Sequence, residues 1–416
     1  MKMNVGLVPA LLLMAAIAAP AMAAKPFKVL QPLSDQPMQV DKGVLRWGGY
    51  YVPSTAETTR WGSLYTTGAK PVLSVPSGSV VTFDTVSHEG MLEDQGRDPV
   101  KFFAKYGVPA NQVLRDAQAI AASSAEHDFV KDGPHIVTGP VEIRGARAGD
   151  VLKVEVLAQE PRVPYGVISN RHGKGALPNE FPETAPPAPG ADAAHPELYN
   201  NVFVFTPIKS IGGKWYASII DKSGREARIQ LKPFNGIMGV AVNATEKANS
   251  IPPGEYGGNL DINDLSVGAT LYLPIQVDGA LFYAADPHFV QGDGEVALTA
   301  LEGSLRSTFR LTVLKLGDLG LPMKLPMKNP FAETREHWIP IGLNQDLNEA
   351  MKDATRQAIQ FVSERCGLDR ASALAYLSAG ADFQVTQVVD RVKGVNGFIR
   401  KSDFAGGCGE SKSGGR

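Results

Sequence analysis

One short segment of the chain gathers side chains that commonly bind divalent metals. Asp286 and His288 stand two residues apart, and the glycine-rich run QGDGE follows them with Asp293 and Glu295. In an extended backbone, residues two apart point to the same face, so each pair is expected to share one face. One imidazole with two or three carboxylates suits Zn²⁺ or a similar divalent ion. The alternative is a polar turn in which the acids make only local hydrogen bonds.

Three further polar segments lie upstream. The turn GEYGGNLDINDL holds Asn259 and Asp261, which we interpret as an amide-recognising side chain and a metal ligand, or else as self-capping turn residues. His88 follows one predicted strand, and His135 with Thr138 precedes another. An isolated histidine beside a strand is usually an ordinary hydrogen-bonded residue, so no segment specifies a reaction by itself.

Several other chemistries are excluded by the motifs that the sequence lacks. It has no nucleophile elbow, no P-loop and no GxGxxG, and Leu92 stands where an HExxH motif begun by His88 needs its second histidine. Cys366 and Cys408 are not placed for nucleophilic catalysis, and they either form a disulfide or remain two thiols. With 41 basic and 43 acidic residues, the chain has no charge excess that indicates a nucleic-acid partner.

The elements that must position these residues are mostly strands. The 416 residues include 43 glycines and 30 prolines, and alternating apolar runs follow many of the turns. The run PVEIRGARAGDVLKVEVL predicts a hairpin, and residues 344–367 have helical spacing, with a second helix after Asp369. We therefore predict a mainly β fold (α+β overall) with two β-rich, sandwich- or barrel-like parts and a C-terminal helical segment.

The predicted organisation begins with an export signal. Lys2, an apolar stretch and the small-residue site at Ala21 and Ala23 are typical of a signal peptide. The mature protein is then expected to be periplasmic or secreted, with no membrane association. The predicted parts are a signal peptide at 1–23, a β-rich domain at 24–185, a second β-rich domain at 186–320, a helical segment with closing strands at 321–405, and a disordered tail at 406–416.

Taken together, the polar segments resemble one known family. HIVTGPVEIRGARAGDVLKVEV, IPPGEYGGNLDINDLSVGATLYLPI and GALFYAADPHFVQGDGEVALTALEGS are similar in order and spacing to the acetamidase/formamidase family. The stretch after His88 and the run DFQVTQVVDRVKGVNGFI look like the same family. The resemblance implies a β-rich, two-part fold and a metal-dependent site that hydrolyses short linear amides to a carboxylate and ammonia. It also implies a homo-oligomer.

The resemblance carries over a set of site residues by position: His88, Asp261, Asp286, His288 and Glu295, with His135 and Asn259 nearby. Our hypothesis assigns them roles. The metal ligands are Asp261, Asp286 and His288, with His88 as a fourth. The catalytic residues are Glu295 and His135, although Glu295 and His88 could exchange roles. The substrate-binding groups are Asn259, Gly258 and Thr138.

Two alternative functions remain open. The first is a non-catalytic envelope β protein that binds a ligand or a structural Ca²⁺, since carboxylate-rich turns suit Ca²⁺. Imidazole favours Zn²⁺ over Ca²⁺ and therefore favours catalysis. The second is an amidase for larger amides, because Tyr256 and Phe289 replace residues that are usual in the family and could reshape its pocket.

Overall fold

The computed structural model describes residues 27–315, 317–318, 320–323, 327–404 and 408. The predicted signal peptide lies outside the described residues, as does the predicted tail apart from Cys408. Within the described part, no helix combines the length and apolar character needed to cross a membrane.

The first of two large sheets contains ten strands, and all its neighbouring pairs are antiparallel except β2 with β6. In spatial order they are β1 (Met38–Val40), β2 (Gly49–Val52), β6 (Ser79–Thr85), β19 (Leu305–Leu314), β8 (Val151–Pro161), β16 (Thr270–Pro274), β20 (Phe331–Glu333), β21 (His337–Asn344), β23 (Lys393–Arg400) and β22 (Ala381–Gln387).

The second sheet contains eleven strands and carries most of the candidate site. Eight follow one path: β12 (Glu226–Gln230), β11 (Lys214–Ile220), β10 (Val202–Ile211), β9 (Tyr165–Asn170), β18 (Leu301–Glu302), β17 (Phe282–Val290), β13 (Phe234–Gly239) and β15 (Gly257–Asn259). Beside them, β7 (Ile136–Arg144) pairs with β17, β3 (Thr59–Trp61) and β5 (Leu73–Pro76). A small separate sheet joins β4 (Ser63–Leu64) to β14 (Ala248–Asn249).

The two large sheets share a hydrophobic core. Phe83 and Phe309 from the first sheet pack ring against ring with Phe282 from the second, at centroid distances of 5.6 to 5.9 Å. All three side chains are fully buried. The prediction of a mainly β fold with a C-terminal helical segment is therefore confirmed.

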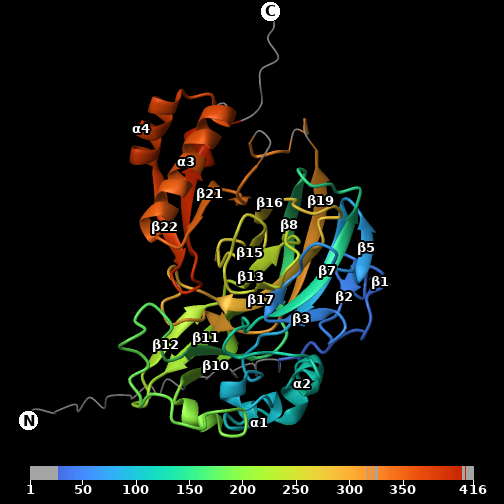
Figure 1. The fold of residues 1–416 in the computed structure, drawn as a ribbon, viewed down its shortest axis with the longest axis vertical. Helices are drawn as coiled ribbons and strands as arrows, with labels where there is room; N and C mark the ends of the chain where they lie inside the picture. Colours follow the sequence, from blue (N-terminus) through green and yellow to red (C-terminus); the bar gives the residue numbers. More distant parts are fainter. Residues whose placement is uncertain (1–26, 316, 319, 324–326, 405–407, 409–416) are drawn as a thin grey trace, which may run out of the picture.

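Four α-helices complete the described fold. Near the N-terminus, α1 (Pro99–Ala104) is capped by Asp98, and α2 (Arg115–Ala122) follows it. The C-terminal helices α3 (Leu347–Cys366) and α4 (Arg370–Gly380) begin at the capping side chains of Asp346 and Asp369. Figure 1 shows α3 and α4 at one end of the molecule, with α1, α2 and β10–β12 at the other.

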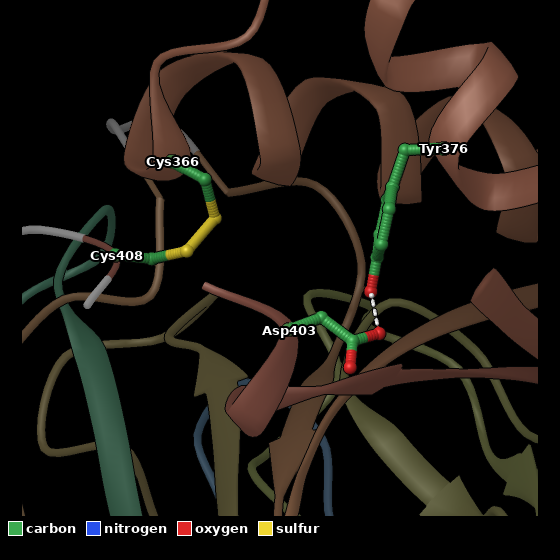
Figure 2. The surroundings of a disulfide bond; sticks show 4 residues. All are labelled: Cys366, Tyr376, Asp403 and Cys408. Atoms are coloured by element: carbon green, nitrogen blue, oxygen red, sulfur yellow. Dashed lines mark hydrogen bonds between the residues drawn. A yellow bond between two sulfur atoms is a disulfide. The ribbon is translucent and has the colours of Figure 1, made fainter. Parts of the chain in front are cut away.

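Three kinds of contact hold the C-terminal helices in place. Helix α3 packs on β21 and β23, and its small residues Ala350 and Ala354 lie directly against Gly342. Cys366 at the end of α3 forms a disulfide with Cys408, and the Tyr376 hydroxyl donates a hydrogen bond of 2.9 Å to Asp403 (Figure 2). The two cysteines, which the sequence left open, are thus paired.

One predicted hairpin is wrong. Strands β7 and β8 follow each other across a short turn, yet β7 joins the second sheet and β8 the first. Residues 171–195 connect β9 to β10. Because these two strands pair with each other, this long segment joins neighbours within one sheet. The domain boundaries given above stay a prediction.

Candidate active site

A cavity of about 330 Å³ opens where β15, β17 and β18 meet the loop between β22 and β23. Its deepest lining consists of buried polar side chains: His88, His135, Asn259, Asp261, Asp286, Glu295, Glu302 and Asp390. His288 lies directly behind this lining and is also fully buried. The fold therefore brings together seven of the nine predicted site residues around one cavity.

His288 is the centre of the carboxylate cluster. Its Nε2 lies 3.1 Å from Asp286 Oδ2 and 2.9 Å from Glu302 Oε1, and its Nδ1 lies 3.8 Å from Asp261 Oδ1. Strand pairing explains the contacts, because Glu302 on β18 stands opposite His288 on β17. The ring of Phe234, opposite His288 on β13, packs edge-on against the imidazole at 4.9 Å.

These buried atoms fit a divalent metal ion. Neither ring nitrogen of His288 and neither carboxylate oxygen of Asp261 has a hydrogen bond of normal geometry, and the same holds for His88 Nε2 and Asp286 Oδ1. Buried polar atoms are normally paired, so a cluster of unpaired ones indicates a missing common partner. Asp261, Asp286 and His288 can each offer a ligand atom within 4.8 Å of the others. His88, His135 and Asp286 form a second such group.

Three of the site carboxylates have left-handed backbones. The φ angles of Asp261, Asp286 and Glu295 are 48°, 52° and 47°. Positive φ is uncommon in residues other than glycine, and such strain concentrates at functional sites. Here it turns the side chains into the cavity. It also makes one prediction wrong: Glu295 is buried while Asp293 is exposed and accepts a hydrogen bond from Asn263, so the two do not share a face.

Crowding shifts the pKa values of the buried acids. Burial, with repulsion from Asp286, raises the pKa of Asp261 to about 7. Burial also raises the pKa of Glu302 to about 7 and holds that of Glu295 well above its usual range. Asp286 differs: burial opposes its ionisation, but the charge of the neighbouring His288 outweighs burial and lowers its pKa. A positive ion among these groups would offset their mutual repulsion.

The two histidines at the cavity are held by different neighbours. The Nδ1 of His135 lies 2.9 Å from Ser250 Oγ, and its Nε2 lies 3.6 Å from Asp286 Oδ1. Burial lowers the pKa of His135 to about 4, so its ring is neutral near pH 7. The His88 ring meets that of His135 edge-on at 5.6 Å, and its Nε2 lies 3.3 Å from Glu89 Oε1.

A buried ion network stands behind His88. Arg171 contacts Glu89 Oε1 at 3.3 Å and Asp94 Oδ2 at 2.6 Å. Burial raises the pKa of Glu89, but the Arg171 guanidinium outweighs burial and lowers that pKa to about 2. Glu89 is therefore a fixed anion that orients His88.

Four of the residues singled out in the sequence do not line the cavity. Thr138 is fully buried on β7 and its hydroxyl pairs with that of Ser54 at 3.1 Å. Gly258 lies on β15 with its α-carbon under the Tyr256 ring. Phe289 belongs to a hydrophobic core, and Tyr256 packs on two others. The idea that Tyr256 and Phe289 reshape the pocket wall is therefore not supported by their positions.

Part of the chain, including most of this site, matches a known protein family. The model of the Acetamidase/Formamidase family matches residues 219–396, the segment that contains Asn259, Asp261 and the whole His288 cluster. The resemblance to the acetamidase/formamidase family is confirmed.

Individual relatives share part of the chain. A protein of Schizosaccharomyces pombe that carries the name formamidase is 31% identical over 232 residues, which cover 47% of this chain and 56% of that protein. An acetamidase of Mycolicibacterium smegmatis is 28% identical, over 39% of this chain and 49% of its own. The chain thus spans about half the length of these curated relatives.

The fold is shared more widely. The crystal structure of an acetamidase from Bacillus halodurans has a TM-score of 0.63 at 25% identity and covers 85% of this chain and 98% of its own. An acetamidase from Yersinia enterocolitica has a TM-score of 0.64 at 21% identity over 85% of this chain and 93% of its own, a likeness of fold alone.

Two acids within the segment matched by the acetamidase/formamidase model were missed by sequence reasoning. Glu302 reaches the site because β18 pairs with β17. Asp390 reaches it from the loop between β22 and β23. Asp390 can meet Asp261 and Glu295 within 4.8 Å. Both occur in runs that carry the resemblance, ALEGS and VVDRVKG, but neither has a nearby histidine or glycine pair that indicates a ligand.

Proposed function

We propose that this chain is an exported, metal-dependent amidohydrolase that cleaves the C–N bond of short linear amides to a carboxylate and ammonia. The observation that supports it most is the set of buried carboxylate and imidazole atoms around His288, at the bottom of a cavity, that lack a hydrogen bond of normal geometry. The match to the acetamidase/formamidase model, over residues 219–396, covers Asp261, Asp286 and His288 but not His88.

The proposed ligand set is Asp261, Asp286 and His288, with His88 as a fourth. A divalent ion held there, with Zn²⁺ favoured over Ca²⁺ by the imidazole nitrogens, supplies Lewis-acid polarisation of the amide carbonyl and acidifies water. Asp286 suits this role because its pKa is lowered and it is shared by two of the candidate groups.

Glu295 is the proposed proton carrier. Because burial and the Asp261 charge raise its pKa, the carboxylate is a stronger base than an ordinary glutamate. It takes a proton from the attacking water and delivers it to the departing ammonia. His135 is neutral and is oriented by Ser250, so it can hold the attacking water through a hydrogen bond.

Asn259 is the proposed oxyanion donor. Its side chain lines the cavity and, among the described residues, makes no hydrogen bond, so its Nδ2 group is available to a substrate. An amide N–H aimed at the developing oxyanion stabilises the transition state. Gly258 and Thr138 lie outside the lining, so Asn259 is preferred among the three predicted substrate-binding groups.

Export is part of the proposal, and the disulfide supports it. Disulfides persist mainly in oxidising compartments such as the bacterial periplasm, and Cys366 pairs with Cys408. Cell fractionation of the full chain tests this: the protein is expected outside the cytoplasm, shortened near Ala23. An uncleaved cytoplasmic protein would contradict export alone. The homo-oligomer stays a prediction.

The central test is ammonia release by metal-quantified protein on formamide, acetamide and larger primary amides, before and after chelation. Chelation is expected to abolish turnover and Zn²⁺ to restore it. Asp286→Asn is expected to lose metal and turnover, while the exposed Asp278→Asn serves as the control. Full activity of folded Asp286→Asn would overturn the assignment. Bound Ca²⁺ without turnover of any amide would favour the binding protein instead.

A further inference from the structure

The cavity is larger than a short amide requires. Its volume of about 330 Å³ lies within the range of clefts that hold ligands of many atoms. Formamide and acetamide have only a few non-hydrogen atoms, so either would leave most of this space to water. The space beyond the carboxylate cluster is therefore available to another part of a substrate.

The residues that line the cavity differ in how far they are buried. The floor carboxylates Asp261 and Asp286 are only 1% and 4% exposed. Apolar side chains that are half-buried follow, including those of Phe129, Leu298 and Val389. The exposed end of the lining contains two cationic residues, Lys174 and Arg391. By their burial, the acidic side chains are innermost in the lining, the apolar side chains are intermediate and the two cations are outermost.

These two cations are open to a ligand. Among the described residues, neither Lys174 nor Arg391 forms an ion pair, and neither side chain donates a hydrogen bond. Two other charged residues of the lining are already paired, since Arg171 contacts Glu89 and Asp94, and Asp132 contacts Lys247.

Lys174 lies near two other cations, Arg171 and Arg391. The charges of these two arginines act on Lys174, and the charge of Asp94 opposes them. Arg391 has a left-handed backbone with φ of 67°. Its loop is fixed by the buried Gln387, whose side chain bonds to the Val389 N–H and the Val392 carbonyl. These two hydrogen bonds of Gln387 therefore fix the loop that carries Arg391 at the mouth of the cavity.

We propose that the substrate of this site is a primary amide with an apolar spacer and a carboxylate at its far end, which Lys174 and Arg391 bind. The inference rests on the proposed function, because it takes the acidic cluster as the place where the amide is cleaved. The reaction consumes one water, breaks the C–N bond and yields ammonia and a dicarboxylate.

A different reading is that the cations only balance the acidic floor. The two readings differ in their dependence on the charge of the substrate. The decisive comparison uses glutaramate, which has a carboxylate end, valeramide, which has a methyl end, and γ-aminobutyramide, which has an ammonium end. The spacers are similar, so the terminal charge is the main variable.

The wild-type protein is expected to hydrolyse glutaramate with kcat/KM about tenfold above that of valeramide, and γ-aminobutyramide least well. Lys174→Met and Arg391→Met are each expected to reduce this preference about threefold to fivefold, mostly through KM, as for an exposed ion pair. Lys174→Arg should retain it. The control is Lys232→Met, because Lys232 pairs with Asp264 and does not line the cavity. High salt should weaken the preference.

Equal kcat/KM for glutaramate and valeramide, or equal losses for both in the two methionine variants, would overturn the inference while leaving amide hydrolysis intact. Release of no ammonia from any amide would instead overturn the proposed function. In that event calorimetric binding of glutaramate decides the inference by itself. Weaker binding in the Lys174→Met, Arg391→Met double variant than in Lys232→Met supports a charged mouth, and equal binding refutes it.

Discussion

Gly236 lies directly against Asp286: a β-carbon built on Gly236 would fall 2.5 Å from Asp286 Oδ2 and closer still to Asp261 Oδ1. The contact arises because β13 runs beside β17, with Ile237 opposite Ala285. Two site carboxylates therefore occupy the space that any other residue at position 236 would fill.

Gly236→Ala is expected to push the Asp261 and Asp286 carboxylates apart. Overpacking of this kind costs about 1 to 3 kcal/mol, and displaced ligands should lower metal affinity by about tenfold to a hundredfold. Metal stoichiometry after dialysis, together with ammonia release, measures the effect. Gly292→Ala is the matched control, because a β-carbon there meets nothing within 4 Å. Normal metal content in Gly236→Ala would show that the carboxylates do not act as ligands in this arrangement.

Asp390 provides a test of whether the C-terminal hairpin completes the site. Burial, with the charges of Asp261 and Glu295, holds the pKa of Asp390 well above its usual range, as expected for an acid inside the cluster. Asp390→Asn keeps the size and removes the acid, so zinc affinity is expected to fall about tenfold or more by titration calorimetry. The control is Asp382→Asn, an exposed acid of β22 that pairs with Arg400. Equal affinities in the two variants would assign Asp390 a purely structural role.

Arg162 is expected to be essential for stability. It is fully buried, lies 2.8 Å from Asp116 and 3.3 Å from Asp84, and Asp84 is also bound by Arg306. Arg162→Met leaves Asp116 without its cation, and breaking a buried pair costs about 3 to 5 kcal/mol. Urea unfolding near pH 7 measures the loss. The exposed Arg147→Met should cost under about 1 kcal/mol.

The loss of stability in Arg162→Met should depend on pH. Burial already raises the pKa of Asp116 in the wild-type protein, despite the opposing charge of Arg162. Removing that charge raises the pKa further above its unfolded value. A group with a raised folded pKa favours folding when protonated, so the deficit should shrink as the pH falls toward 4 and grow toward 7. A deficit that is constant over this range would contradict the explanation.

The disulfide should stabilise the C-terminal end without affecting chemistry. Cys366 and Cys408 are 42 residues apart in sequence, and closing a loop of that length is worth up to about 4 kcal/mol in the chain-entropy account. The double variant Cys366→Ala, Cys408→Ala should unfold at lower urea concentration. Its rate of amide hydrolysis should be unchanged, because neither cysteine lines the cavity. Wild-type protein whose unfolding is insensitive to reductant would contradict this prediction.

Local sequence was enough for some of the site. Asp286 and His288 are two apart in one strand, and their side chains do meet at 3.1 Å. The helix predicted over 344–367 occurs as α3, because its capping residues and apolar spacing are local signals. Local turns also singled out Asp261 and His88, and the family resemblance joined these distant segments into one predicted site.

The tertiary structure decided which side chains meet, through the pairing of strands and the position of the loop between β22 and β23. Glu302 reaches His288 only because β18 lies beside β17, and Asp390 arrives from a hairpin more than a hundred residues later in the chain. The failed hairpin of β7 and β8 has the same origin: a short turn permits pairing, but the core that each strand can bury decides its sheet. Likewise, the left-handed backbone of Glu295 separates it from Asp293, and the alternation expected of an extended segment did not predict that conformation.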